Sequence, residues 1–331
     1  MASYHQQYKH LAAETSGNWE LIKPYQLSIG ITPKCNSKCE YCNNWKDSSS
    51  SVPSIEMISG IILDAKELGI EQVLFSGGEP LLHKEFINIL RYTRTLELDP
   101  LLITNGTMLT DRIIQQLIDS GCQKVGISLD CLHPDVYRRT RGIGNRVILD
   151  HIEHIIAEYP ELNLSICCTV HKQNLHHLEE LLHYCIERSL PIQFQPIDTS
   201  NMSADLRAAY QPDSDDIYQL DQFFKKSVAL KEGGYPIYNE IQYLQNIGRY
   251  FLERHFTPIK CYAAFTQILI NQEMKLLSCW GGEVIGDVRE SSLHSLWKSP
   301  KLNEFRSKAL VRQCDGCYYS CHLSKSYNQL V

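Results

Sequence analysis

The sequence lacks the run of roughly 18 apolar residues that a membrane-spanning helix requires, and its first residues, MASYHQQYKH, lack the apolar core of a secretion signal. It also lacks an excess of positive charge, since 32 Lys and Arg residues stand against 38 Asp and Glu residues and give a formal net charge of -6. A chain without a basic field has little general attraction for phosphate backbones. We therefore expect a cytoplasmic protein that binds neither nucleic acid nor a membrane.

Cysteine, in contrast, is abundant, with 13 cysteines among 331 residues. Disulfides are rare in a reducing compartment, so metal ligation or redox chemistry better explains cysteines that cluster. Two clusters lie near the two ends of the chain. The isolated residues Cys122, Cys167, Cys168 and Cys185 fall within expected strands or helices, where we expect small core residues.

Short β-branched runs alternate with helical segments from Tyr25 onward, which is the pattern of a parallel sheet with crossover helices. The expected strands are Gln26–Thr32, Gln72–Ser76, Leu101–Thr104, Lys124–Leu129, Asn163–Val170 and Ile192–Pro196. Six such units are fewer than the eight of a closed barrel, which typically spans about 250 residues. We predict an α/β fold, a partial (β/α)6 TIM-type barrel, with its chemistry in the loops that follow the strands.

The pattern changes after the sixth expected strand. We divide the chain into an N-terminal extension (1–24), a barrel (25–200), a helical connector (201–255) and a small cysteine-rich C-terminal domain (256–331). Within the connector, the spacing predicts helices over Ile217–Leu230 and Ile241–Phe256.

The first cysteine cluster, Cys35-Asn-Ser-Lys-Cys39-Glu-Tyr-Cys42, follows the first expected strand. Three thiolates can hold three irons of a [4Fe–4S] cluster and leave the fourth iron open. A structural zinc site would use four protein ligands, and no fourth Cys or His follows within about forty residues. The cluster interpretation is therefore favoured over zinc.

Cys35, Cys39, Tyr41 and Cys42 together resemble the Cys-x3-Cys-x-aromatic-Cys signature of the radical S-adenosylmethionine (SAM) superfamily. The resemblance continues at Ser76-Gly-Gly-Glu-Pro80, because in that family a GGEP segment binds the amino group of the cofactor. Taken alone, each later motif is also compatible with a turn or a surface charge. By order and location the resemblance implies these cofactor contacts: Tyr41, Gly77, Gly78, Glu79, Asn105, Ser128, Asp130 and Arg141.

The resemblance also implies a reaction. A radical SAM enzyme cleaves S-adenosylmethionine reductively into a 5′-deoxyadenosyl radical, which abstracts a hydrogen atom from the substrate. Such an enzyme takes electrons from a flavodoxin- or ferredoxin-type donor. We therefore expect an oxidoreductase-like enzyme with a SAM-binding [4Fe–4S] cluster.

The second cysteine cluster comprises Cys261, Cys279, Cys314, Cys317 and Cys321. Together with Ile285-Gly-Asp-Val288 and a Ser-Leu-x-x-Leu-Trp segment at 292–297, it resembles the SPASM or twitch domain of radical enzymes. The resemblance implies one auxiliary [4Fe–4S] cluster, held by Cys261, Cys279 and two of the last three cysteines. Met274 departs from this pattern, since the family usually has glycine there. A zinc ribbon is the alternative.

The substrate is not named by the sequence. The resemblance implies a ribosomally made peptide that is crosslinked, epimerised or oxidised, and the alternative is a small molecule such as a sugar or alcohol that is dehydrogenated or rearranged. A non-catalytic metal-binding scaffold is a second alternative. Cys131, directly after Asp130, is either a hydrogen donor near the cofactor or a small residue that fills a turn.

Overall fold

The computed structural model describes residues 23–46, 51–200, 202–253, 261–311, 313 and 317–319. Residues 1–22 of the expected N-terminal extension lie outside this part of the chain. Across the described ranges, no helix is long and apolar enough to cross a membrane.

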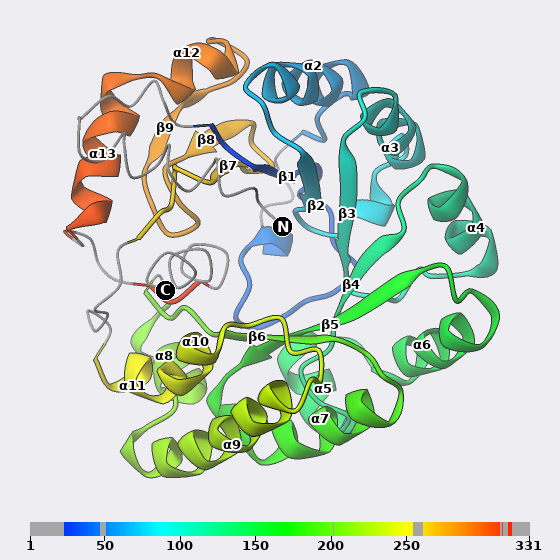
Figure 1. The fold of residues 1–331 in the computed structure, drawn as a ribbon, viewed down its shortest axis with the longest axis vertical. Coiled ribbons are helices and arrows are strands. Elements are labelled where there is room, and N and C mark those ends of the chain that lie inside the picture. Colours follow the sequence, from blue (N-terminus) through cyan, green and yellow to red (C-terminus); the bar gives the residue numbers. More distant parts are fainter. Residues whose placement is uncertain are drawn as a thin grey trace.

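One nine-stranded sheet runs through the described residues in the order β6-β5-β4-β3-β2-β1-β7-β8-β9. Every pairing from β6 to β7 is parallel, and the pairings of β7 with β8 and of β8 with β9 are antiparallel. The sheet curves around the centre of the molecule (Figure 1). The strands are β1 Gln26–Gly30, β2 Gln72–Ser76, β3 Asp99–Thr104, β4 Lys124–Ser128, β5 Asn163–Val170, β6 Ile192–Pro196, β7 Gln267–Ile270, β8 Lys275–Leu277 and β9 Val284–Asp287.

Helices connect the strands and lie on the outer side of the curved sheet (Figure 1). The α-helices are α2 Ile55–Glu67, α3 Phe86–Thr95, α4 Asp111–Asp119, α5 Pro134–Arg141, α6 Arg146–Glu158, α7 Leu178–Glu187, α8 Ala204–Tyr210, α9 Ser214–Glu232, α10 Ile241–Gln245, α11 Ile247–Leu252, α12 Leu293–Trp297 and α13 Pro300–Leu310. Short 3-10 helices are η2 Asn44–Lys46, η3 Pro80–Leu82 and η4 Lys172–His177.

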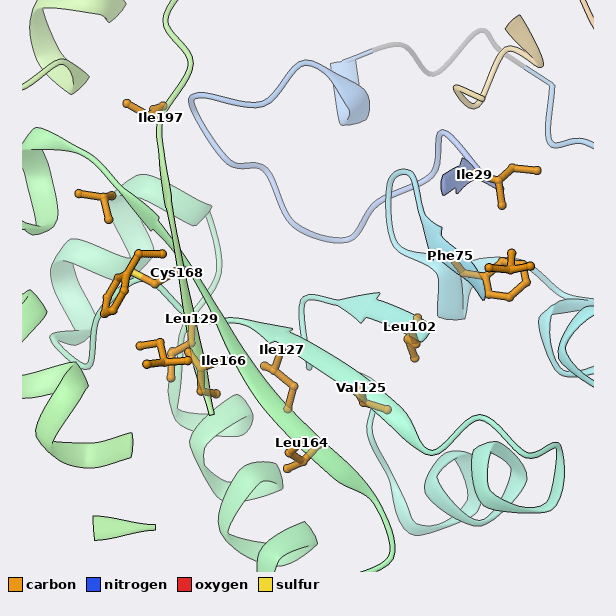
Figure 2. Packing of buried hydrophobic residues seen from close by; sticks show 14 of the residues in the cluster. Ile29, Phe75, Leu102, Val125, Ile127, Leu129, Leu164, Ile166, Cys168 and Ile197 are labelled. Atoms are coloured by element: carbon orange, nitrogen blue, oxygen red, sulfur yellow. The ribbon is translucent and has the colours of Figure 1, made fainter. Parts of the chain in front are cut away.

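The two faces of the barrel strands differ in burial. Along β2, β3, β5 and β6, a fully buried residue alternates with a partly exposed one. Successive strand side chains point to opposite faces, so the outer face is packed and the inner face is accessible. The packed face forms one core with residues from consecutive strands, among them Phe75, Leu102, Ile127 and Ile166 (Figure 2). The accessible inner face of the strands leaves space in which a cofactor can bind.

The predicted partial barrel is confirmed, with small differences at the element ends. β1 ends at Gly30 instead of Thr32, β4 ends at Ser128 instead of Leu129, and β3 begins at Asp99, two residues earlier than expected. Cys122, Cys168 and Cys185 are buried as expected, and Cys167 is partly exposed on the inner face of β5.

The described part of Ile241–Phe256 is helical as expected, but it forms two short helices, α10 and α11, that are separated at Asn246. Asn246 has φ -113° and ψ 3°, and its side-chain Nδ2 donates to the Gln242 carbonyl. A short polar side chain that bonds nearby backbone groups commonly interrupts a helix. Residues 254–256 lie outside the described residues.

The C-terminal strands continue the barrel sheet. β7 pairs with β1 in parallel, with Gln26 opposite Gln267, so β1 is a central strand and all five of its residues are buried. The Asn271–Met274 turn then leads into β8, and Met274 takes a left-handed φ of 60°. A non-glycine residue there costs about 1–2 kcal/mol of backbone strain, which explains why the family usually has glycine. In this chain the Met274 side chain is buried in the core.

Phe75 is fully buried and packs edge-to-face on Phe86 with ring centroids 5.6 Å apart. We expect Phe75→Ala to lower the free energy of unfolding by about 3–5 kcal/mol, because it leaves a cavity behind β2. The control Tyr218→Ala removes an aromatic side chain that is 75% exposed and should change the free energy of unfolding by less than about 0.5 kcal/mol. Urea unfolding of the two apoproteins measures the difference, and equal losses would contradict this account of the core.

Candidate active site

The three cysteines of the first cluster line a pocket of about 230 Å³ at the carboxyl ends of the barrel strands. They come from the loop after β1, and the opposite walls come from the ends of β2 to β5. Parallel strands bring their carboxyl ends to one rim, so residues far apart in sequence meet there. The wall residues from these strands are Ser76, Ile103, Thr104, Ser128 and Thr169.

The loop that carries the cysteines is fixed to the end of α5. Ser37 Oγ donates to the Arg141 carbonyl at 2.7 Å, and the Lys38 amide donates to the same oxygen. The Glu40 amide donates to the Thr140 carbonyl at 3.0 Å. The last carbonyls of a helix have no partner within the helix, and here the cysteine loop supplies one.

The Gly77-Gly78 turn after β2 lies directly against this loop. The Gly78 amide donates to the Thr32 carbonyl at 2.7 Å, and a Cβ on Gly78 would lie 2.1 Å from the Lys34 carbonyl oxygen. Gly77 has φ +125°, a conformation that side chains disfavour. Only glycine therefore fits at these two positions.

Glu79 is 1% exposed and is not among the residues that line the pocket. Its carboxylate accepts from Thr104 Oγ1 at 2.7 Å and from the Asn105 amide at 2.8 Å. Burial raises its pKa, although these hydrogen bonds oppose the shift. Glu79 thus ties the GGEP turn to the end of β3.

Asp130 is fully buried and is also absent from the pocket lining. It accepts from Arg141 Nε at 2.7 Å and Nη2 at 2.8 Å, from the Tyr41 hydroxyl at 2.7 Å, and from the Thr169 amide at 2.8 Å. Burial by itself raises the pKa of Asp130, but the Arg141 guanidinium and the neighbouring His171 outweigh it and hold the pKa below its usual range. Both Tyr41 and Arg141 line the pocket, so Asp130 orients two wall residues.

The other residues singled out from the sequence lie either on the pocket wall or buried behind it. Asn105 and Ser128 line the pocket, and Asn105 Nδ2 donates to Asn36 Oδ1 at 2.7 Å. Cys131 is fully buried and does not line the pocket, and its thiol points to the His133 carbonyl at 3.7 Å. This burial fits the alternative of a small residue that fills a turn, and a role of Cys131 as a hydrogen donor stays a prediction.

Sequence reasoning missed two side chains that hold the site together. Trp45 Nε1 donates to the Cys39 carbonyl at 2.9 Å, and Asn44 Nδ2 donates to the Gly77 carbonyl at 2.9 Å. Gln272, in the β7–β8 turn, donates in turn to Asn44 Oδ1. The sequence signal for Asn44 and Trp45 was their position two and three residues after Cys42.

The second cysteine site is described in part, because Cys314 and Cys321 lie outside the described residues. Cys261 packs against Ala263 and Ala309, with Cys279 beside them. Burial raises the pKa of Cys317, and the nearby Cys261 and Cys279 raise it further, which places the three thiols in one neighbourhood.

Two observations test whether iron–sulfur clusters fit these sites. The buried Ser278 hydroxyl, next to Cys279, has no hydrogen-bond partner among the described groups, and a Cβ on Gly282 would lie 2.7 Å from Cys279 Sγ. In the part of the chain that the structure describes, no three Cys, His or carboxylate side chains converge as a single ion requires. Three thiols line one pocket at the first site and three described thiols gather at the second, and thiolates are the ligands that iron–sulfur clusters take.

Comparisons with known proteins agree with this geometry. Residues 29–185 match the radical SAM superfamily, and residues 261–318 match the SPASM iron–sulfur cluster-binding domain. The chain belongs to the radical SAM superfamily and carries a C-terminal SPASM domain. This membership implies an enzyme that uses S-adenosylmethionine and [4Fe–4S] clusters.

Individual relatives differ in how much of the chain they match. A probable GTP 3′,8-cyclase of Methanococcus maripaludis strain DSM 14266 is 29% identical over 196 residues, 56% of this chain and 62% of that protein. The chain thus spans less than two thirds of that relative. The PqqA peptide cyclase of Bradyrhizobium diazoefficiens is 24% identical over 317 residues, 89% of this chain and 79% of that protein.

Two solved structures share the fold along almost the whole chain. Streptococcus suis SuiB bound to precursor peptide SuiA has a TM-score of 0.73 at 19% identity, over 94% of this chain and 75% of that one. Native anSMEcpe with bound AdoMet and Cp18Cys peptide has a TM-score of 0.66 at 16% identity, over 92% of this chain and 95% of that one.

Gly78→Ala should push the cysteine loop away from the GGEP turn, because the new Cβ meets backbone that cannot rotate aside. We expect a loss of about 1–3 kcal/mol in the free energy of unfolding and weaker iron retention after anaerobic reconstitution. The control Gly60→Ala lies in α2 with nothing within 4 Å of the added Cβ, and should be neutral or stabilising. Full iron retention in Gly78→Ala would refute the close packing of the two loops.

Asp130→Asn should leave the buried Arg141 charge without its partner. We expect a loss of about 3–5 kcal/mol in urea unfolding of the apoprotein. The control Glu153→Gln breaks an ion pair with Arg188, in which the side chains are 49% and 27% exposed, and should cost less than about 1 kcal/mol. A similar cost for both variants would show that the Asp130 pair contributes no more than a surface pair.

Proposed function

We propose that this chain modifies a peptide by radical SAM chemistry, through crosslinking, epimerisation or oxidation. The observation that carries the proposal is the extent of the matches. The PqqA peptide cyclase aligns over 89% of this chain, and the SuiB and anSMEcpe structures, each with a bound peptide, align over more than 90%. The GTP cyclase aligns over 56%.

In this proposal Cys35, Cys39 and Cys42 would hold the SAM-binding cluster, which, with S-adenosylmethionine bound, would supply the 5′-deoxyadenosyl radical for hydrogen-atom abstraction from the peptide. The backbone at Gly77 and Gly78 lets the cofactor's amino end approach closely. Arg141 offers a guanidinium to its carboxylate end, while Asn105 and Ser128 offer hydrogen bonds to the ribose. Asp130 and Glu79 act from behind the wall by orienting these groups.

The C-terminal SPASM domain has a separate role in this proposal. Cys261, Cys279 and Cys317 are assigned to one auxiliary [4Fe–4S] cluster, with the fourth ligand from Cys314 or Cys321. The proposed role of this cluster is to accept the electron that a substrate radical releases. A flavodoxin- or ferredoxin-type donor would reduce the first cluster. The described cysteines are all free thiols, which supports a location in the reducing cytoplasm.

A small-molecule substrate is the second candidate. The 29% identity to the GTP cyclase favours it, since that identity exceeds the 24% to the peptide cyclase. The discriminating experiment incubates the anaerobically reconstituted protein and S-adenosylmethionine with GTP or with short peptides encoded beside its gene. Peptide-dependent 5′-deoxyadenosine and a changed peptide mass support the first candidate. Consumption of GTP, or of a sugar or alcohol in a metabolite extract, would replace it with the second.

Cysteine variants should separate the two cluster sites. Cys35→Ala should abolish 5′-deoxyadenosine formation, whereas Cys261→Ala should retain uncoupled cleavage and lose peptide product. The control Cys122→Ala alters a buried thiol outside both sites and should keep both activities. Iron analysis should give about eight irons per wild-type chain, two clusters' worth. About four irons together with bound zinc would make the C-terminal site structural.

A further inference from the structure

Arg306, on α13, is a fully buried cation without a carboxylate partner among the described residues. Its Nε donates to the Ala264 carbonyl at 2.9 Å, and its Nη1 donates to the Trp297 carbonyl at 2.9 Å and to Asn303 Oδ1. All three acceptors are neutral. Its Nη2 has no hydrogen-bond partner in the described part of the chain.

This arrangement is costly for a residue that only fastens neighbouring segments. Removing a charged group from water costs several kcal/mol unless an opposite charge compensates. Burial lowers the pKa of Arg306 to about 9, so the guanidinium is still charged at neutral pH. The Trp297 ring, 4.4 Å from the guanidinium carbon, offers a partial compensation only. Among the described residues, no negative group compensates the charge of Arg306.

The second cysteine site lies on the same side of α13. The buried face of this helix consists of Leu302, Arg306 and Ala309, and Ala309 packs against Cys261. Residues three apart on a helix are neighbours on one face. Moreover, Arg306 Nε bonds the carbonyl of Ala264, three residues after Cys261. Two separate elements thus bring the guanidinium to the neighbourhood of this cysteine.

We propose that Arg306 provides the compensating positive charge for the auxiliary cluster and raises its reduction potential. The inference rests on the proposed function, which assigns that cluster to Cys261, Cys279 and Cys317. A cluster ligated by thiolates carries net negative charge, and the charge grows when the cluster accepts an electron. A fixed cation in a poorly solvated interior stabilises the reduced form more than the oxidised form. Arg306 therefore acts on the cluster through its charge and is not one of the cluster's ligands.

The test is a potentiometric titration of the reconstituted two-cluster protein, followed by electron paramagnetic resonance. Arg306→Gln removes the charge, and Arg306→Lys keeps it while losing the planar fork. The matched control is Lys308→Gln, which removes a cation from the same helix at a side chain that is 49% exposed. The SAM-binding cluster of each variant is an internal reference, because it lies in the barrel.

We expect Arg306→Gln to lower the potential of the auxiliary cluster alone, with Arg306→Lys and Lys308→Gln close to wild type. Arg306→Met is a second neutral variant in case Arg306→Gln does not fold, because an unbranched apolar side chain adapts to an irregular space. An unchanged auxiliary potential in a folded neutral variant, or an equal shift of both clusters, would overturn the inference. A wild-type protein without a second cluster signal would overturn the proposed function itself.

Discussion

The buried carboxylate of Asp130 connects three parts of the chain that must act together. Its oxygens accept hydrogen bonds from the Arg141 guanidinium on α5, the Tyr41 hydroxyl in the cysteine loop and the Thr169 amide on β5. Because the Asp130 side chain is fully buried, a group that moved away would leave a charge or a dipole unpaired at a cost of several kcal/mol. The pocket wall is thus held in one geometry before a cofactor arrives, so little ordering remains to be done on binding.

The pairing of β1 with β7 connects the pocket to the part of the chain that carries the second cysteine site. β1 leads into the first cysteine loop, and β7 leads into the turn from which Gln272 donates to Asn44, next to that loop. A side chain on Gly30 would collide with the Gln272 backbone, so the two strands can meet at this point only through glycine. The barrel and the SPASM strands therefore share one sheet, and paired strands connect the two cysteine sites.

Local patterns in the sequence were enough to predict the six barrel strands, the cysteine loop and the GGEP turn, since each depends on residues close together in the chain. The roles of Glu79 and Asp130 could not be predicted in the same way. A carboxylate after a barrel strand can face the pocket or turn behind it, and the choice depends on partners such as Thr104 and Arg141 that only the fold brings near. The pairing of β7 with β1 is likewise a contact across more than 200 residues that no periodicity reveals.

Arg141 and Arg306 illustrate two ways in which this fold keeps a cation out of water. Arg141 has a carboxylate from its own barrel, so its charge is balanced and its direction is fixed, while part of it is accessible at the pocket. Arg306 is more deeply buried, and its partners in the described part of the chain are two carbonyls, an amide oxygen and an indole ring. Since low dielectric strengthens every electrostatic interaction, the second arrangement leaves an unbalanced field inside the C-terminal module. Such a field is unfavourable for the apoprotein and favourable for an anionic group beside Cys261, so the same side chain would couple cluster binding to the stability of the module.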